Sequence, residues 1–176
     1  MRTRPVEPAV ESAQAEDFRS LMSGFPTGVV VVTTFDLEGG PRGLTCSSLS
    51  SVALDPPTLL VCVREGSPTL RAVEQRGSFA VNLLHDGGRP VAERFASGVP
   101  DRFEGVLWRT GPAAAGPHLP DHARTVADCK VTAIKPVGDH SVVFGEVLEV
   151  TAYRDAAAPL MYGLRRYAVW PTAAVD

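Results

Sequence analysis

Apolar residues in this chain fall into short runs that have the length and β-branched composition of strands rather than of helices. The pattern predicts strands over residues 29–35, 42–52, 58–63, 79–84, 127–135 and 141–153. Turn-forming residues at 36–41 and 138–140 separate two pairs of these runs, so each pair is expected to form a hairpin.

Helical periodicity is confined to short segments, which are residues 15–23, 68–77 and 89–95. The first places Phe18 and Leu21 on one face, and the second opens with a serine N-cap followed by Pro68. Residues 97–125 are rich in Gly, Pro and Ala. They are expected to form a loop with one short strand candidate at residues 106–109.

Many strands with few helices between them indicate a mainly β protein, a closed β-barrel decorated by a few short peripheral helices. A doubly wound sheet would need a helix after nearly every strand, and those helices are missing from the pattern. The sequence contains no internal repeat and no long flexible linker. Residues 15–170 are therefore expected to form one domain, between tails at residues 1–14 and 171–176.

Composition limits the classes of partner and compartment. The 176 residues carry a formal net charge of -3 and no dense run of Lys and Arg, which argues against a nucleic-acid partner. Neither a membrane-spanning run nor a signal peptide is recognisable, so a cytoplasmic protein is expected. The cysteines, Cys46, Cys62 and Cys129, are odd in number and form no CxxC pair, so neither a zinc site nor a disulfide framework is indicated.

Residues 43–52 form an unusual row, with five hydroxyl side chains and one thiol between two apolar runs. Short hydroxyls leave backbone amides uncovered, which suits the close approach of an anionic ligand. A Ser- and Thr-rich edge strand that faces water would have the same composition. The residues of this row alone leave both interpretations open.

Familiar nucleotide and metal motifs are missing. The sequence has no G-x-G-x-x-G after a strand and no P-loop. His118 and His122 are four residues apart, but Pro117 and Pro120 prevent the regular helix that would give this spacing a meaning, and an exposed loop is expected. No metal site is predicted.

Three further features are plausible ligand contacts. His140 occupies a turn at the rim of the expected barrel, although a solvated turn residue is equally compatible with that place. The segment from Tyr162 to Tyr167 gathers aromatic and cationic side chains, either to stack on a flat ligand and pair with phosphate or to cap the core. Asn82 lies in an apolar strand and must bond either to backbone or to a ligand.

Several short motifs, each weak alone, follow one another in a specific order. They include Phe25-Pro26-Thr27-Gly28-Val29, Gly43-Leu44-Thr45-Cys46-Ser47-Ser48, Phe79-Ala80-Val81-Asn82-Leu83-Leu84, Asp101-Arg102-Phe103, Gly138-Asp139-His140 and Pro159-Leu160-Met161-Tyr162. In this order they resemble the flavin reductase-like family, over about residues 18–167. The resemblance implies the Greek-key, FMN-binding type of split β-barrel, and it favours the ligand cradle for the hydroxyl row.

The resemblance also implies site residues. Flavin-binding positions carried over from the family are Thr45, Cys46, Ser47, Ser48, Ser51, Val52, Asn82 and Phe95. The nicotinamide side of the site would be formed by His140, Arg166 and Tyr167, with His140 as the catalytic residue. The chain departs from the family pattern at Gly163-Leu164, where an aromatic or His followed by Arg is common.

The family members most similar to this chain are short NAD(P)H:flavin oxidoreductases, the reductase components of two-component monooxygenases. The resemblance therefore implies an NADH-dependent reductase of FAD, or of FMN, in which a hydride passes from nicotinamide C4 to flavin N5. The expected partners are a flavin-dependent monooxygenase and a second copy in a homodimer. A tightly flavin-bound enzyme with another substrate, or a non-catalytic flavin- or haem-binding protein, are the alternatives.

Overall fold

The computed structural model describes residues 14–154 and 156–171. Its helices are α1 (Ala15–Ser23), α2 (Pro68–Arg76), the 3-10 helix η1 (Asp86–Gly88) and α3 (Arg89–Ala96). Its strands are β1 (Thr27–Gly28), β2 (Val30–Phe35), β3 (Pro41–Cys46), β4 (Ser50–Leu54), β5 (Pro57–Arg64), β6 (Ser78–Leu84), β7 (Arg109–Thr110), β8 (Pro117–His118), β9 (Ala123–Val137), β10 (His140–Ala152), β11 (Leu160–Gly163) and β12 (Arg166–Val169).

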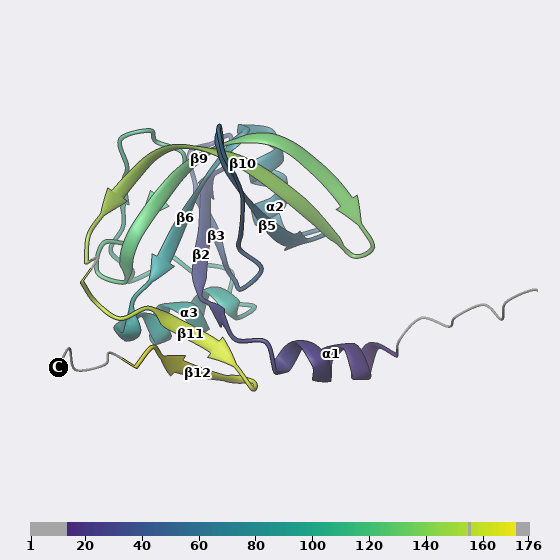
Figure 1. Cartoon of the computed structure of the whole chain (residues 1–176). Helices are drawn as coiled ribbons and strands as arrows, with labels where there is room; N and C mark the ends of the chain where they lie inside the picture. Colours follow the sequence, from purple (N-terminus) through teal and green to yellow (C-terminus); the bar gives the residue numbers. More distant parts are fainter. Residues whose placement is uncertain (1–13, 155, 172–176) are drawn as a thin grey trace, which may run out of the picture.

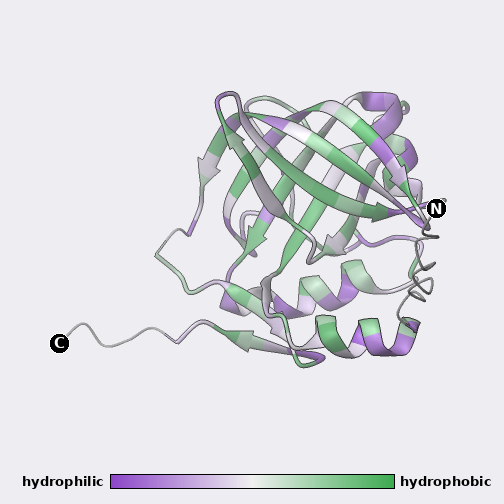
Figure 2. Ribbon diagram, turned by 45° about the vertical axis from the view of Figure 1, so that its right-hand side comes forward, coloured by the Kyte–Doolittle hydropathy of each residue, from purple (hydrophilic) through white to green (hydrophobic). Residues whose placement is uncertain are grey.

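Seven antiparallel strands form the main sheet, in the order β3-β2-β6-β9-β10-β5-β4. The sheet curls around one core, with the long hairpin β9–β10 arching over the top in Figure 1, and apolar residues line its strands (Figure 2). Its two end strands do not pair with each other, so the barrel is split. The prediction of a mainly β split barrel with a few short peripheral helices is confirmed.

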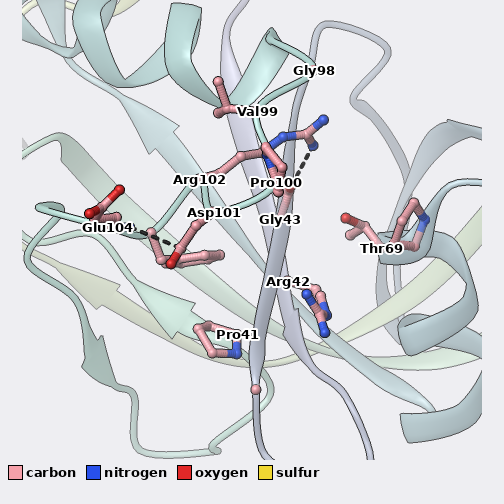
Figure 3. A pocket seen from close by; sticks show the side chains of 13 residues that line it. Pro41, Arg42, Gly43, Thr69, Gly98, Val99, Pro100, Asp101, Arg102 and Glu104 are labelled. Carbon is pink, nitrogen blue, oxygen red and sulfur yellow. Dashed lines mark hydrogen bonds between the residues drawn. The ribbon is translucent and has the colours of Figure 1, made fainter.

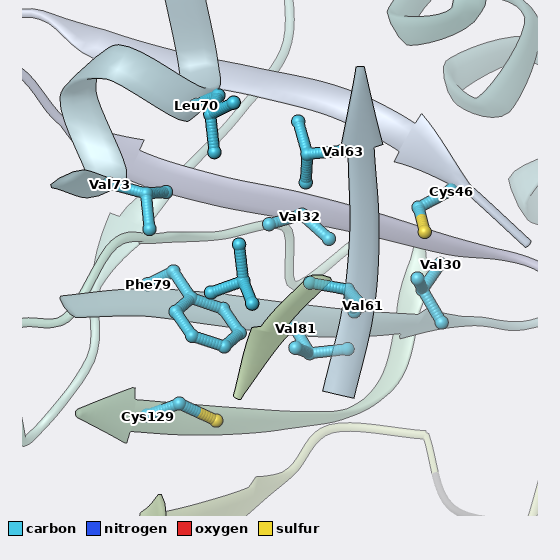
Figure 4. Packing of buried hydrophobic residues seen from close by; sticks show 11 residues of the cluster. Val30, Val32, Cys46, Val61, Val63, Leu70, Val73, Phe79, Val81 and Cys129 are labelled. Carbon is cyan, nitrogen blue, oxygen red and sulfur yellow. The ribbon is translucent and has the colours of Figure 1, made fainter. Parts of the chain in front are cut away.

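Strand β2 is the centre of the fold because both of its faces are covered. All six of its residues are buried. Val30 and Val32 point into the barrel core with Phe79, whereas Val31 points to a second core under α3. Figure 4 shows the first of these clusters. Burial on both faces explains why this run reads as continuously apolar instead of alternating.

The hydroxyl-bearing segment is not one strand, and the prediction of a strand over residues 42–52 is wrong in this respect. The chain leaves the sheet after Cys46 and re-enters it at Ser50 on the opposite edge, so β3 and β4 are the two ends of the same sheet. Ser48 lies in the segment that connects β3 to β4. Its hydroxyl accepts from the backbone N–H of Cys62 at 2.8 Å and donates to the Cys62 carbonyl at 3.2 Å.

Two other predictions fail in the second half of the chain. Residues 106–109 are not a strand; the short strand β7 starts at Arg109 and pairs with β8. His118 is not in an exposed loop, because its side chain is fully buried between Asp128 (Nε2 to Oδ2, 3.1 Å) and the Tyr153 hydroxyl (Nδ1 to Oη, 3.0 Å). A polar pair enclosed by the fold cannot be recognised from local polarity.

The last strands were not anticipated. Strands β11 and β12 form a hairpin that pairs with β1 in a separate three-stranded sheet. Figure 1 shows this hairpin and α1 below the barrel. The expected tails fall mostly outside the described residues, and the boundaries 15–170 of the domain stay a prediction. None of the helices in the described part of the chain is long and apolar enough to span a membrane.

Asn82 ties the second core together. Its amide nitrogen lies 3.2 Å from the carbonyl oxygens of Val31 and Pro117 and 3.1 Å from the Thr33 hydroxyl. Its amide oxygen accepts from the backbone N–H of Leu119 at 2.8 Å. The side chain is fully buried, so all of its hydrogen-bonding capacity serves the protein itself.

Replacing Asn82 by Ala is expected to destabilise the protein by about 3 kcal/mol, because several buried backbone groups lose their partner at once. Chemical denaturation followed by circular dichroism measures the change. The Asn82→Ala protein that remains folded should bind flavin as the unchanged chain does. A selective loss of flavin affinity at unchanged stability would instead support the direct flavin contact expected from the sequence.

Candidate functional site

Two open cavities lie at opposite ends of β3. The first has a volume of about 740 Å³ and is bounded by the start of β3, the start of α2 and residues 98–104 (Figure 3). Its cations are already engaged. Arg42 pairs with Asp36 at 2.8 Å, and Arg102 donates to the carbonyls of Gly43 and Ser97. These contacts hold the loop at residues 98–104 in place and leave the two arginines occupied. We therefore do not take this cavity as the ligand site.

The second cavity, of about 790 Å³, lies where the hydroxyl row meets both ends of the described chain. It combines hydroxyl, aromatic and cationic side chains. The residues that line it are Glu16, Phe18, Arg19, Met22, Ser23, Phe25, Thr27, Ser47, Ser48, Tyr162, Gly163 and Arg165. A volume in this range suits a ligand of cofactor size. We therefore take this cavity as the candidate site.

Helix α1 forms one wall of the candidate site. Glu16 and Asp17 in its first turn complement the helix dipole, and its chain turns away at Gly24 before Pro26. No residue of α1 is buried in the single chain, and Phe18, Leu21 and Phe25 are more than half exposed. The backbone N–H of Leu164 donates to the Ser23 carbonyl at 2.6 Å, which fixes the end of α1 to the β11–β12 turn.

The hydroxyl row supplies a second wall, and its members do different work. Ser47 is exposed at the cavity, whereas the Ser48 hydroxyl is hydrogen-bonded to the backbone of Cys62. The Thr45 hydroxyl donates to the Ala92 carbonyl at 2.6 Å, and Cys46 is buried with its sulfur 3.0 Å from the Ser48 oxygen. The Ser47 hydroxyl is thus the member of this group that is left to meet a ligand.

Aromatic side chains close the site from the C-terminal hairpin. Tyr162 and Tyr167 are cross-strand partners, so their rings lie on the same face of the hairpin with centroids 5.2 Å apart. Tyr162 reaches the cavity, and Tyr167 lies deeper, beneath the Arg89 guanidinium at 5.6 Å. Burial raises the pKa of the Tyr167 hydroxyl, so the ring is neutral at physiological pH.

The remaining predicted site residues lie elsewhere in the single chain. Ser51 and Val52 are exposed on the edge strand β4. Phe95 is buried against Gly43, where a β-carbon would lie 2.8 Å from its ring, and Asn82 is equally enclosed. Arg166 is exposed opposite Gly163 in the hairpin.

His140 lies apart from these residues. Its turn is well away from the β11–β12 hairpin in Figure 1. Its Nδ1 lies 2.8 Å from Oδ1 of Asp139, and this hydrogen bond lowers the pKa of the Asp139 carboxyl. Because a carboxylate only accepts, Nδ1 carries the proton and Nε2 is directed elsewhere.

Sequence reasoning missed Arg19, Thr27 and Arg165 as site residues. Thr27 belonged to a quoted motif, and Arg165 belonged to the cation-rich segment that was interpreted as a rim. The pairing of β1 with β11 places Thr27 opposite Tyr162, and knowledge of this pairing would have identified Thr27 as a site residue. Arg19 carried no such signal, because a charged residue on an amphipathic helix is normally solvated.

Comparison with known proteins settles the family. The family model described as "Flavin reductase like domain" matches residues 22–171. The chain belongs to this family. A flavin reductase (NADPH) from Lentzea aerocolonigenes is 51% identical over 89% of this chain and 90% of its own length. A flavin reductase (NADH) from Kitasatospora aureofaciens is 42% identical, covering 95% and 87% respectively.

A solved structure agrees with this family membership. Nitrilotriacetate monooxygenase component B from Mycobacterium thermoresistibile superposes with a TM-score of 0.84 at 34% identity, covering 92% of this chain and 89% of the other. The candidate site of the present chain fits a flavin, as expected for a member of this family. Tyr162 offers a ring for stacking and Ser47 and Thr27 offer hydroxyls, while Arg19 and Arg165 give the same cavity positive charge.

The two neighbouring serines should respond differently to removal of the hydroxyl. Ser48→Ala leaves the Cys62 N–H and carbonyl without their partner, so it should cost about 1–2 kcal/mol of stability and also weaken flavin binding. Ser47→Ala should leave stability within about 0.5 kcal/mol and weaken flavin binding by roughly three- to tenfold.

Thermal denaturation and flavin fluorescence titration measure the two effects of the serine variants. Ser48→Thr, which keeps the hydroxyl, is the matched control and should recover most of the stability. Equal stability losses in both alanine variants would contradict the division of roles.

Burial makes two of the thiols poor nucleophiles. It raises the pKa of Cys46, and it raises that of Cys129 to about 12. The thiolate fraction of both therefore rises only at alkaline pH. At pH 8, a thiol reagent should modify both far more slowly in the native protein than in the denatured one, as mass spectrometry of labelled peptides would measure. Fast labelling of Cys46 in the native protein would contradict this effect of burial.

Proposed function

We propose that this chain is an NAD(P)H:flavin oxidoreductase that reduces FAD, or FMN, and releases it to a separate flavin-dependent oxygenase. The observation that carries the proposal is the composition of the candidate site. It joins a hydroxyl-bearing loop, a tyrosine face and two arginines, and among the residues that line it Glu16 is the only carboxylate. Such a site can bind and orient flat, phosphorylated ligands, but it offers no acid–base pair or nucleophile.

Bound flavin supplies the redox chemistry, by accepting a hydride from a nicotinamide stacked on it. The residues of this chain supply orientation. Ser47 and the loop held by Ser48 would hold the polar edge of the flavin, and Tyr162 would limit the space above its ring. The exposed, open cavity is consistent with ligands that come and go in each turnover.

His140 needs a second copy of the chain to take part. In one chain it is remote from the candidate site, yet its Nε2 is free to face a ligand because Nδ1 is held by Asp139. The exposed edge strand β4 and the apolar residues of α1 have no cover in the single chain. A homodimer that buries them is the arrangement we propose, with His140 of one copy on the nicotinamide side of the other copy's site.

The oxygenase partner is inferred from the chemistry and from the relatives. A reductase that releases reduced flavin needs an acceptor for it, and a structurally similar protein is a component of nitrilotriacetate monooxygenase. The relatives differ in nucleotide, one being named for NADPH and the other for NADH. The expectation of NADH from the sequence stays a prediction.

Mixing purified protein with excess FAD and either NADH or NADPH tests the activity. Flavin-dependent loss of the 340 nm absorbance is expected, with catalytic amounts of protein. A protein that retains flavin through dialysis and consumes neither nucleotide would support a binding protein instead. A repeat with FMN ranks the two flavins.

His140→Ala should lower nicotinamide turnover by roughly tenfold and leave the flavin dissociation constant within a factor of two, because the imidazole would touch only the second ligand. Steady-state kinetics and flavin titration on the same preparation give both values. A collapse of flavin affinity would show that His140 is wrongly placed.

A further inference from the structure

The β11–β12 turn holds two residues in a backbone conformation that suits neither. Leu164 and Arg165 have φ angles of 51° and 58°. They connect strands in which Gly163 pairs with Arg166, so they are the two central residues of a tight hairpin. Such turns need positive φ at both positions and strongly favour Asn-Gly or Gly-Gly, because side chains other than Gly, Asn or Asp are strained there.

The surroundings explain how the strained turn persists. The backbone N–H of Leu164 donates to the Ser23 carbonyl of α1 at 2.6 Å. At Gly163 a β-carbon would lie only 3.1 Å from Cβ of Pro26, so the hairpin sits tightly on the segment after α1. These contacts fix the turn shape but involve only backbone atoms at residue 164. They give no reason for an arginine side chain at residue 165.

The Arg165 side chain lines the candidate site together with Arg19. Within residues 14–154 and 156–171, none of the ion pairs involves either arginine. Glu16 is the only carboxylate among the lining residues. Among the described residues the cavity therefore presents two arginines that belong to no ion pair, one of them at a position where backbone energy favours glycine. Strain of this kind clusters at functional sites.

We infer that Arg165, with Arg19, forms a subsite for the 2′-phosphate of NADPH and so makes NADPH the preferred hydride donor, in place of the NADH expected from the sequence. This inference rests on the proposed function. A 2′-phosphate is a monoester that carries close to two negative charges at neutral pH, and arginine binds such a group through two parallel hydrogen bonds. Two arginines that form no ion pair within the described residues match that charge. NADH has only the singly charged phosphates of its pyrophosphate.

Arg165 and Ser47 reach the cavity from different elements of the fold. The hydroxyl Ser47 comes from the loop between β3 and β4, whereas Arg165 comes from the turn between β11 and β12. The relative named for NADPH is 51% identical and the one named for NADH is 42% identical, which agrees with this assignment without deciding it.

Arg165→Gly tests the subsite, because it removes the guanidinium and relieves the strain together. The KM for NADPH should rise roughly tenfold or more, with the KM for NADH and the flavin dissociation constant within a factor of two. The melting temperature should rise by about 2 °C. Loss of ligand selectivity together with a gain in stability is not expected of a residue with a structural role.

Leu164→Gly is the matched control. It relieves the same kind of strain one residue away and leaves the lining of the cavity unchanged, so it should stabilise the protein without changing the KM for NADPH. Arg165→Lys keeps one positive charge without the fork of donors, and should lose part of the discrimination.

Binding of small probes separates this inference from the proposed function. Calorimetric titration with adenosine 2′,5′-bisphosphate and with 5′-AMP should show roughly tenfold tighter binding of the bisphosphate, and Arg165→Gly should abolish the difference. Equal binding of the two probes, or equal KM changes for NADPH and NADH, would overturn the subsite. Weaker flavin binding in Arg165→Gly would assign the arginine to the flavin phosphate instead. Absence of any turnover with normal probe discrimination would overturn the reductase and leave the subsite standing.

Discussion

The contact between the Ser48 hydroxyl and the Cys62 backbone is the constraint on which the rest of the candidate site depends. The main sheet has two free edges, β3 and β4, and the chain must pass from one to the other within residues 47–49. At this point the Ser48 hydroxyl both donates to and accepts from the Cys62 backbone, in place of a backbone hydrogen bond between neighbouring strands. The loop that it holds places Ser47 at the cavity, so the same contact links the two edges of the sheet and exposes the Ser47 hydroxyl.

Packing in the core fixes the position of this loop, which a ligand site requires. Strand β2 is buried on both faces, with the barrel interior on one side and the layer under α3 on the other. Thr45 and Gly43 of the neighbouring strand β3 are held against α3 by a hydrogen bond and by the Phe95 ring. Residues anchored on both sides allow little movement, which fixes the point where the chain leaves the sheet.

The sequence predicted the barrel and the helices well, because periodicity reports burial directly. The split of residues 42–52 was not predictable from local pattern, since it depends on which distant backbone Ser48 meets. Asn82 and His118 show the same limit. Their polarity is visible in the sequence, but the partners that bury them, Leu119 and Asp128 among others, are brought close only by the fold. Arg165 is a different case. It stands out because its φ angle is positive, a conformation that glycine usually occupies, and the sequence alone does not reveal that angle.

Two walls of the candidate site, α1 and the β11–β12 hairpin, come from the ends of the described chain, whereas the barrel and the loop with Ser47 come from what lies between. Helix α1 and the β11–β12 hairpin meet at the hydrogen bond from Leu164 to Ser23, and neither contributes its main contacts to the barrel core. Such peripheral units open at lower free energy than a central sheet does. The molecule thus divides into a central sheet and a periphery that shapes the open cavity, so a substitution in α1 or in the hairpin can alter the cavity without disturbing the barrel.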